Sequence, residues 1–131
     1  MIRKEIVEMA SETPYSINTS VKFGPLELVD VKALAAACTE QWFNQTLCRV
    51  NDSVVRVGVL QGEFHWHKHD TEDEFFYLVD GRFLIDLEGR SVELRPGQGF
   101  LVPRGVMHCT RAPERSVVLM IEQATVNPTG D

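Results

Sequence analysis

The sequence predicts an all-β fold, a sandwich or barrel of antiparallel strands, with one short helix ahead of the strands. Eight or nine short runs rich in β-branched and aromatic residues follow one another between residues 46 and 123. Clusters of Gly, Pro, Asp and Asn separate these runs, which is typical of turns between strands. A single segment, residues 30–42, has the composition of a helix.

We expect one domain with three parts: an N-terminal arm over residues 1–45, a barrel over residues 46–122 and an exposed C-terminal tail over residues 123–131. A chain of 131 residues is long enough for one hydrophobic core. Its 44% hydrophobic and 24% charged residues are in the range of globular proteins.

The arm contains short apolar pieces broken by Pro14, Gly24 and Pro25, which predicts one or two short edge strands. The helix follows in the segment "DVKALAAACTEQW". Asp30 is its expected N-cap, because an Asp side chain accepts hydrogen bonds from the free amides of a first helical turn. Good helix formers come next, so two or three turns are expected.

Nine runs predict the strands. They are residues 46–51, 53–60, 64–69, 74–79, 82–87, 90–94, 99–103, 106–111 and 116–123. Turn-forming clusters such as "DTED", "RPGQG" and "APER" lie between them. The tail "TVNPTGD" has too little apolar content to order itself and is expected to be an exposed end.

Charge and composition limit the partners. The net charge of −6 and the pI near 5.2 argue against a nucleic-acid partner, which needs clustered Lys and Arg. No window approaches the ~20 apolar residues that cross a bilayer, so no membrane partner is expected. Residues 1–16 lack the apolar run of a signal peptide, and the three cysteines form no CxxC pair. A soluble, cytoplasmic protein is therefore expected.

All four histidines of the chain fall in two short segments. If residues 64–69 form a strand, the side chains of His65, His67 and His69 lie on one face, because alternate side chains of a strand share a face. A lone histidine on a strand is usually not a ligand, but three in alternation favour metal binding. His108 lies about forty residues further on, in a segment punctuated by Gly and Pro.

These two segments resemble the two motifs of the cupin superfamily. The first reads His67, Lys68, His69, then "DTED", then Glu74, then "FFYLVD" and Gly81; the second runs from Gly97 through Pro103 and Gly105 to His108. Their fifteen-residue spacer is similar to that of small single-domain bacterial cupins, which are often described as mannose-6-phosphate isomerase-like. The resemblance implies a double-stranded β-helix barrel with its site inside the mouth.

The resemblance also implies a metal site of His67, His69, Glu74 and His108. Pairing His65 with His67 instead would leave Val79 where the motif has its glycine. Three imidazoles and one carboxylate suit a divalent Fe, Mn, Ni, Co or Zn ion, whereas Mg or Ca would want more oxygen ligands. The alternative is a barrel that keeps these histidines but binds metal weakly.

Residues around the site have alternative interpretations. His65, one step deeper on the same face, is a candidate catalytic general base or a hydrogen-bonded core histidine. Asp70, Glu72 and Asp73 are expected to be solvated acids. Cys109 is expected to point away from the metal and to pack.

Three further residues are candidates for a substrate pocket. Phe76 and Phe100 lie on the ligand side of their strands and would form apolar walls, as they also would in an ordinary barrel core. Arg56, within an apolar run, would hold an anionic substrate or would point outward into solvent.

The function expected from this resemblance is that of a metal-dependent cupin acting on a small organic molecule. Oxygen-dependent cleavage by a dioxygenase is favoured slightly, because a His-rich site with open positions suits iron. An isomerase or lyase of sugar or sugar-phosphate type is the second hypothesis, although no Lys/Arg cluster is committed to a phosphate. The third is a metabolite-binding homodimer without turnover.

Overall fold

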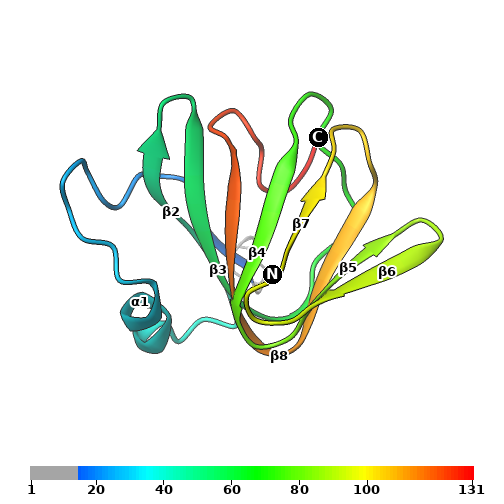
Figure 1. The fold of residues 1–131 in the computed structure, drawn as a ribbon, viewed down its shortest axis with the longest axis horizontal. Coiled ribbons are helices and arrows are strands. Elements are labelled where there is room, and N and C mark those ends of the chain that lie inside the picture. Colours follow the sequence, from blue (N-terminus) through cyan, green and yellow to red (C-terminus); the bar gives the residue numbers. More distant parts are fainter. Residues whose placement is uncertain (1–14) are drawn as a thin grey trace, which may run out of the picture.

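A computed structural model describes residues 15–131 (Figure 1). In chain order the elements are β1 Tyr15–Asn18, α1 Val31–Ala37, β2 Trp42–Val50, β3 Ser53–Glu63, β4 Glu74–Asp80, β5 Phe83–Leu87, β6 Arg90–Leu94, β7 Gly99–Val102 and β8 His108–Gln123. The predicted all-β class is confirmed. No helix among the described residues is long and apolar enough to cross a membrane.

The strands form one sheet in the order β1-β2-β3-β8-β4-β7, and β5 pairs with both β6 and β8. Strand β8 holds the fold together, because its sixteen residues pair with β3, β4 and β5 in turn. All of these pairings are antiparallel; β1 alone among the described strands joins its neighbour in parallel. The long shared strand curves the sheet around an interior (Figure 1).

Two predictions about strands are wrong. The cluster "APER" is no turn: the run 116–123 and the part of the run 106–111 from His108 onward belong to the single strand β8, and the register shifts between the pairs Leu60↔Ser116 and Gly62↔Ala112. Pro113 is tolerated there because a shifted ladder requires no donor at that position. The run 64–69 forms no named strand and contributes only an isolated bridge between His67 and His108.

The helix prediction is confirmed, at a length of seven residues. Asp30 is its N-cap and accepts a hydrogen bond from the amide of Ala33 at 3.0 Å. The helix packs on the outer face of the sheet, where Leu34 joins a cluster built on Leu47, Val57 and Val59.

The larger apolar cluster lies inside the barrel. Its buried members are Trp42, Leu60, Phe64, Phe76, Leu78, Phe83, Ile85, Leu94, Val102, Ala112, Val118 and Met120. Strand β3 shows the division, because Leu60 belongs to the inner cluster and Val57 and Val59 to the outer one. Alternation along the strands therefore produces two apolar layers, one on each side of the sheet.

The structure explains why a glycine ends the first motif. Gly81 has a φ of +98°, and a Cβ there would lie only 2.7 Å from the Cα of Ser116. A side chain is excluded both by the backbone conformation and by the close approach of β8.

The C-terminal segment was expected to be an exposed end, and this is wrong for part of it. Residues 124–131, which we call the strap, fold back toward the site, and Val126 is buried. Thr125 donates a hydrogen bond to the Glu72 carboxylate at 2.8 Å, and the amide of Asp131 donates to the carbonyl of Lys68 at 2.9 Å. The strap is therefore ordered by hydrogen bonds to distant residues, although its composition contains too little apolar surface to order it.

Candidate metal centre

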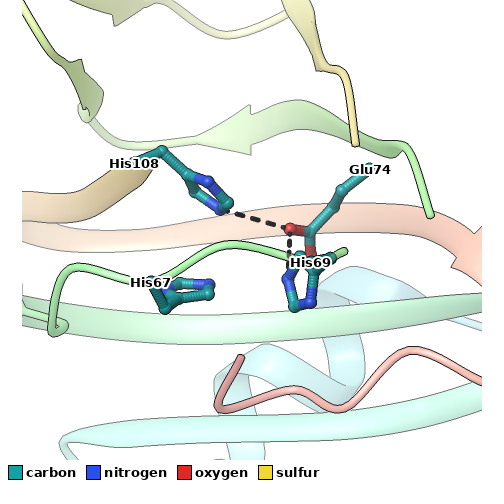
Figure 2. Close-up of side chains that lie close together, drawn as sticks. All are labelled: His67, His69, Glu74 and His108. Carbon is teal, nitrogen blue, oxygen red and sulfur yellow. Dashed lines mark ion pairs between the residues drawn. The ribbon is translucent and has the colours of Figure 1, made fainter. Parts of the chain in front are cut away.

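Four side chains converge inside the barrel mouth: His67, His69, Glu74 and His108 (Figure 2). Each offers one ligand atom, and these atoms all lie within 4.8 Å of one another. His67 and His69 come from the segment between β3 and β4, Glu74 begins β4 and His108 begins β8. The structure thus brings together the four residues that the resemblance implied as ligands.

Main-chain hydrogen bonds position the histidine segment. His67 and His108 exchange amide and carbonyl bonds, both 2.9 Å long, and the amide of Gly105 donates to the carbonyl of His69 at 2.8 Å. The segment before β4 is therefore tied to the turn before β8 without being a regular strand. The positive φ of Gly105, +77°, lets the chain make that turn.

Two of the imidazoles have their tautomer fixed by neighbouring carbonyls. The Nδ1 of His67 lies 2.9 Å from the carbonyl of His65, and the Nδ1 of His108 lies 2.9 Å from that of Val106. Because a carbonyl oxygen only accepts, each Nδ1 carries a proton, and in the neutral form of each ring the lone pair is therefore on Nε2. This is the arrangement that metal-binding histidines use.

The cluster contains polar atoms that the protein leaves unsatisfied. The Nε2 atoms of His69 and His108 lie 3.3 and 3.6 Å from Oε1 of Glu74 (Figure 2). Despite these distances, all three atoms are buried without a hydrogen bond of good geometry. Buried polar groups without partners are costly, and a divalent cation would satisfy all three at once. The donor set therefore fits a metal ion.

Burial and charge set the protonation of the cluster. Burial lowers the pKa of His67 to about 4, so its imidazole is neutral at pH 7. Burial acts in the same direction on His69, but the close contact with Glu74 and its charge outweigh it and raise the pKa of His69. Burial would raise the pKa of Glu74, yet the close contacts with Glu122 and the two imidazoles hold it well below the usual range.

Glu122 lies directly across from Glu74 in the pairing of β4 with β8. Burial and the adjacent Glu74 charge raise the pKa of Glu122 well above that of an exposed carboxyl. On its other side, Arg56 approaches the Glu122 carboxylate at 3.3 Å. The candidate ligand Glu74 is thus backed by a second carboxyl and a buried guanidinium.

The structure contradicts one of the two sequence interpretations of Arg56. Its side chain is buried, with a residue exposure of 2%, so the outward, solvated interpretation is wrong. It faces the barrel interior because it lies on the same face of β3 as Leu60, and its charge is compensated by Glu122. It does not line the cavity beside the cluster, and its contact with an anionic substrate stays a prediction.

His65 and the acidic turn also differ from expectation. His65 is exposed instead of lying deeper on the ligand face, and its Nε2 donates to the carbonyl of Thr129 at 2.7 Å. Its role as a general base stays a prediction. Among the acids, Glu72 is buried and bonded to Thr125, whereas Asp70 and Asp73 are exposed as expected.

Cys109 has the surroundings of a packing residue. It is buried, and its thiol donates to the carbonyl of Phe64 at 3.0 Å. Burial raises the pKa of the thiol to about 11, so it stays protonated at pH 7.

A small cavity of about 30 Å³ adjoins the cluster. Its walls are formed by Trp42, Asn44, Leu60, Phe64, His67, Glu74, Phe76, Phe83, Thr110, Met120, Glu122 and Pro128. Phe76 is thus a cavity wall, whereas Phe100 is not and lies beneath the Arg90 guanidinium, 5.9 Å from it. The sequence interpretation missed Asn44, Glu122 and Pro128. Glu122 could have been found from strand alternation, because it lies two residues after Met120 and so on the same face of its strand. Asn44 was missed because it lies before residue 46, where its strand was expected to start.

The strap closes over the histidines. Pro128 lines the cavity, and a Cβ at Gly130 would lie 2.5 Å from the Cβ of His67. Asp131 fixes the far end, because its carboxylate accepts from the amide of Asp70 at 2.7 Å. The expected exposed tail is therefore a wall of the site.

Comparison with known proteins agrees with this geometry. Residues 53–122 match the cupin domain family. The chain is 34% identical over 97 residues to the uncharacterized protein YdbB of Bacillus subtilis, covering 73% of this chain and 86% of that protein. Its fold is similar to a cupin-2 domain containing protein from Shewanella frigidimarina, with a TM-score of 0.70, 25% identity and coverage of 73% and 94% of the two chains.

A second solved structure, protein NMB1881 from Neisseria meningitidis, is similar with a TM-score of 0.67 and 26% identity, covering 74% of this chain and 99% of that chain. The matched family region contains both histidine segments and Glu74. The chain belongs to the cupin family.

Proposed function

We propose that this cupin holds one divalent transition metal ion, Fe, Mn, Ni, Co or Zn, through His67, His69, Glu74 and His108, and acts on a small organic molecule next to it. The observation that carries the proposal is that four ligand atoms lie within 4.8 Å of one another, and that those of His69, Glu74 and His108 are buried and unpartnered. Exposed acidic clusters are common without a function, but this one is buried and contains three imidazoles, of which His67 is neutral at pH 7.

The bound ion would supply Lewis-acid polarisation of a substrate oxygen or, as iron, the activation of O₂. The protein's own groups prepare the site for this chemistry. Glu74 brings one negative charge close to the ion, and neutral His67 adds a donor without adding charge. The apolar walls formed by Trp42, Phe64 and Phe76 keep bulk water away from the ligand.

Oxygen-dependent cleavage, as in a dioxygenase, is the reaction we favour, because three imidazoles and one carboxylate with open positions suit iron. An isomerase or lyase is the second candidate, and one observation favours it. Glu122 lines the cavity with a raised pKa, so it could hold the proton that such reactions move. A phosphorylated substrate is less favoured, because none of the described cavity-lining residues is Lys or Arg.

One experiment separates these candidates. The full chain is loaded in turn with Fe²⁺, Mn²⁺, Ni²⁺, Co²⁺ and Zn²⁺ and incubated with small hydroxy acids, diketones and sugars. Oxygen uptake with Fe²⁺ alone supports a dioxygenase. Solvent deuterium entering the substrate without oxygen uptake supports an isomerase or lyase. Binding without either signal supports the non-catalytic alternative, and absence of metal binding would overturn the proposal.

A homodimer is also proposed. Leu101, Ile121 and Tyr77 are exposed on the outer face of neighbouring strands β7, β8 and β4. Leu101 and Ile121 both pair with Phe75, so they flank one strand and form a continuous apolar row. Light scattering should give the mass of a dimer for the wild type and of a monomer for Leu101→Asp; a monomeric wild type would contradict the proposal.

A cytoplasmic location remains a proposal as well. All three cysteines of the chain, Cys38, Cys48 and Cys109, are free, which suits a reducing compartment.

A further inference from the structure

The cavity beside the histidines contains acceptor atoms that the proposed metal site does not use. Asn44 on β2 and Glu122 on β8 both line it and are more than nine-tenths buried, with exposures of 9% and 5%. Oδ1 of Asn44 and Oε1 of Glu122 have no hydrogen-bond partner. A buried acceptor without a partner costs free energy, so a donor from a bound molecule would be favoured there.

The charge next to these acceptors argues against an anionic partner. Arg56 lies 3.3 Å from the Glu122 carboxyl group but does not line the cavity, so its guanidinium does not face a molecule bound there. An anionic group entering the cavity would meet the carboxyl groups of Glu122 and Glu74, both of which line it. The group that fits is an uncharged hydrogen-bond donor.

The volume limits how much of a ligand can enter. A cavity of 30 Å³ has room for about two water molecules, and so for an arm of about two non-hydrogen atoms. The aromatic walls formed by Trp42, Phe64 and Phe76 suit a carbon atom, and a hydroxyl group can donate its single proton to one of the two acceptors. A hydroxymethyl arm satisfies both requirements.

We propose that Asn44 and Glu122 bind an uncharged hydroxyl group of the ligand, and that this cupin takes a small molecule with a metal-binding oxygen at one end and a short hydroxylated arm at the other. The inference rests on the proposed metal function and names the substrate class for it. Asn44 and Glu122 are specificity residues in this assignment, and neither belongs to the four candidate ligands.

The test compares three probes of similar size on the Mn²⁺-loaded full chain. Each carries a carboxylate for the metal, and the other end is a hydroxyl in 3-hydroxypropionate, a methyl in propionate and a second carboxylate in malonate. Dissociation constants are measured from the water-proton relaxation of the bound Mn²⁺. We expect 3-hydroxypropionate to bind at least about tenfold more tightly than either of the others, because it alone carries a hydroxyl proton to donate to a buried acceptor.

Two variants assign that preference to residues. Asn44→Leu keeps the number of side-chain heavy atoms but removes the acceptor, and it should reduce the preference to less than about threefold, with Mn²⁺ affinity retained. Glu122→Gln keeps the shape of the side chain but leaves Arg56 without its carboxylate. The affinity for malonate should therefore rise at least about tenfold relative to the affinity for 3-hydroxypropionate. The matched control is Gln45→Leu, since Gln45 is a buried neighbour on β2 that lies outside the cavity lining and bonds to the carbonyl of Ser20 at 2.7 Å. It should keep the wild-type preference.

The outcomes separate the two proposals. If the wild type binds Mn²⁺ but shows equal affinity for the three probes, the hydroxyl subsite is overturned and the metal site stands. If the wild type binds no metal, both fall. Circular dichroism checks the fold of each variant; should Asn44→Leu unfold, the smaller change Asn44→Ser and the malonate shift of Glu122→Gln decide the question.

Discussion

The barrel interior has two unlike ends, and strand β4 shows the contrast within five residues. Glu74, at its start, is a buried carboxylate with an unpartnered oxygen. Phe76 forms a wall of the cavity, and Leu78, further along the same face, is completely buried among apolar side chains. We call these regions the mouth end and the closed end. The closed end buries apolar surface, which stabilises the fold, and the mouth end keeps polar atoms unsatisfied at a cost in stability.

This difference between the two ends indicates which residues contribute to stability and which contribute to binding. At the closed end, Leu78, Ile85 and Val118 are fully inaccessible and have no polar side-chain groups to satisfy. At the mouth end, His69, Glu74 and His108 leave atoms that only another molecule or an ion could satisfy. Changes at the closed end should therefore affect stability, and changes at the mouth end should affect binding.

The largest expected effect is at the mouth end. His108→Ala removes one of the four candidate ligands, so metal affinity should fall by more than about 100-fold. Calorimetric titration of the chelator-treated protein with Zn²⁺ measures it. His67→Ala should lower metal affinity to a similar degree. Unchanged metal affinity in both variants would show that His67 and His108 are not ligands.

The next effect is at the closed end. Ile85→Ala deletes buried methyl and methylene groups and should lower the free energy of unfolding by about 2–5 kcal/mol. Urea denaturation of the metal-free protein measures this loss. The folded fraction should still bind one metal ion per chain; a large loss of metal affinity with native stability would erase the distinction between the two ends.

A smaller effect should appear with pH. Burial lowers the pKa of His67 to about 4 in the folded protein, from about 6.5 in the unfolded chain. The unfolded chain therefore binds more protons between these values, so the His67 contribution to stability is lost as pH falls from about 6.5 to about 4. Melting temperatures in chelator should decline less steeply over this window for His67→Asn than for the wild type. Parallel declines would contradict the assignment.

The smallest expected effect is that of His65→Ala. His65 is exposed and contacts the strap through Thr129, so its loss should change metal affinity by less than about tenfold. The same Zn²⁺ titration measures it beside His67→Ala. Equal losses from His65→Ala, His67→Ala and His108→Ala would overturn the choice of His67 and His69 as the ligand pair.

The parts of the structure that the sequence predicted well depend on short-range patterns. The N-cap at Asp30 is a local hydrogen bond, and the spacing of His67, His69 and Glu74 places them together through a few turns of fixed geometry. Gly81 could be anticipated from its motif position, and the approach of Ser116 supplies the physical reason.

The parts that were wrong or missed depend on long-range contacts. The expected turn "APER" became part of β8 because β3 continues to pair across it. The expected tail became a wall because Thr125 and Asp131 find partners more than fifty residues away. Glu122 and Arg56 are buried together only because two distant strands pair, which alternation within one strand cannot reveal.

The most direct test of the account is the metal content of the purified full chain, prepared without chelator or histidine tag and measured by inductively coupled plasma mass spectrometry beside His67→Ala. We predict close to one transition-metal ion per chain in the wild type and a large loss in the variant. Absence of metal from the wild type even after reconstitution, or equal metal in both proteins, would contradict the claim that the buried histidine and glutamate cluster is a metal centre.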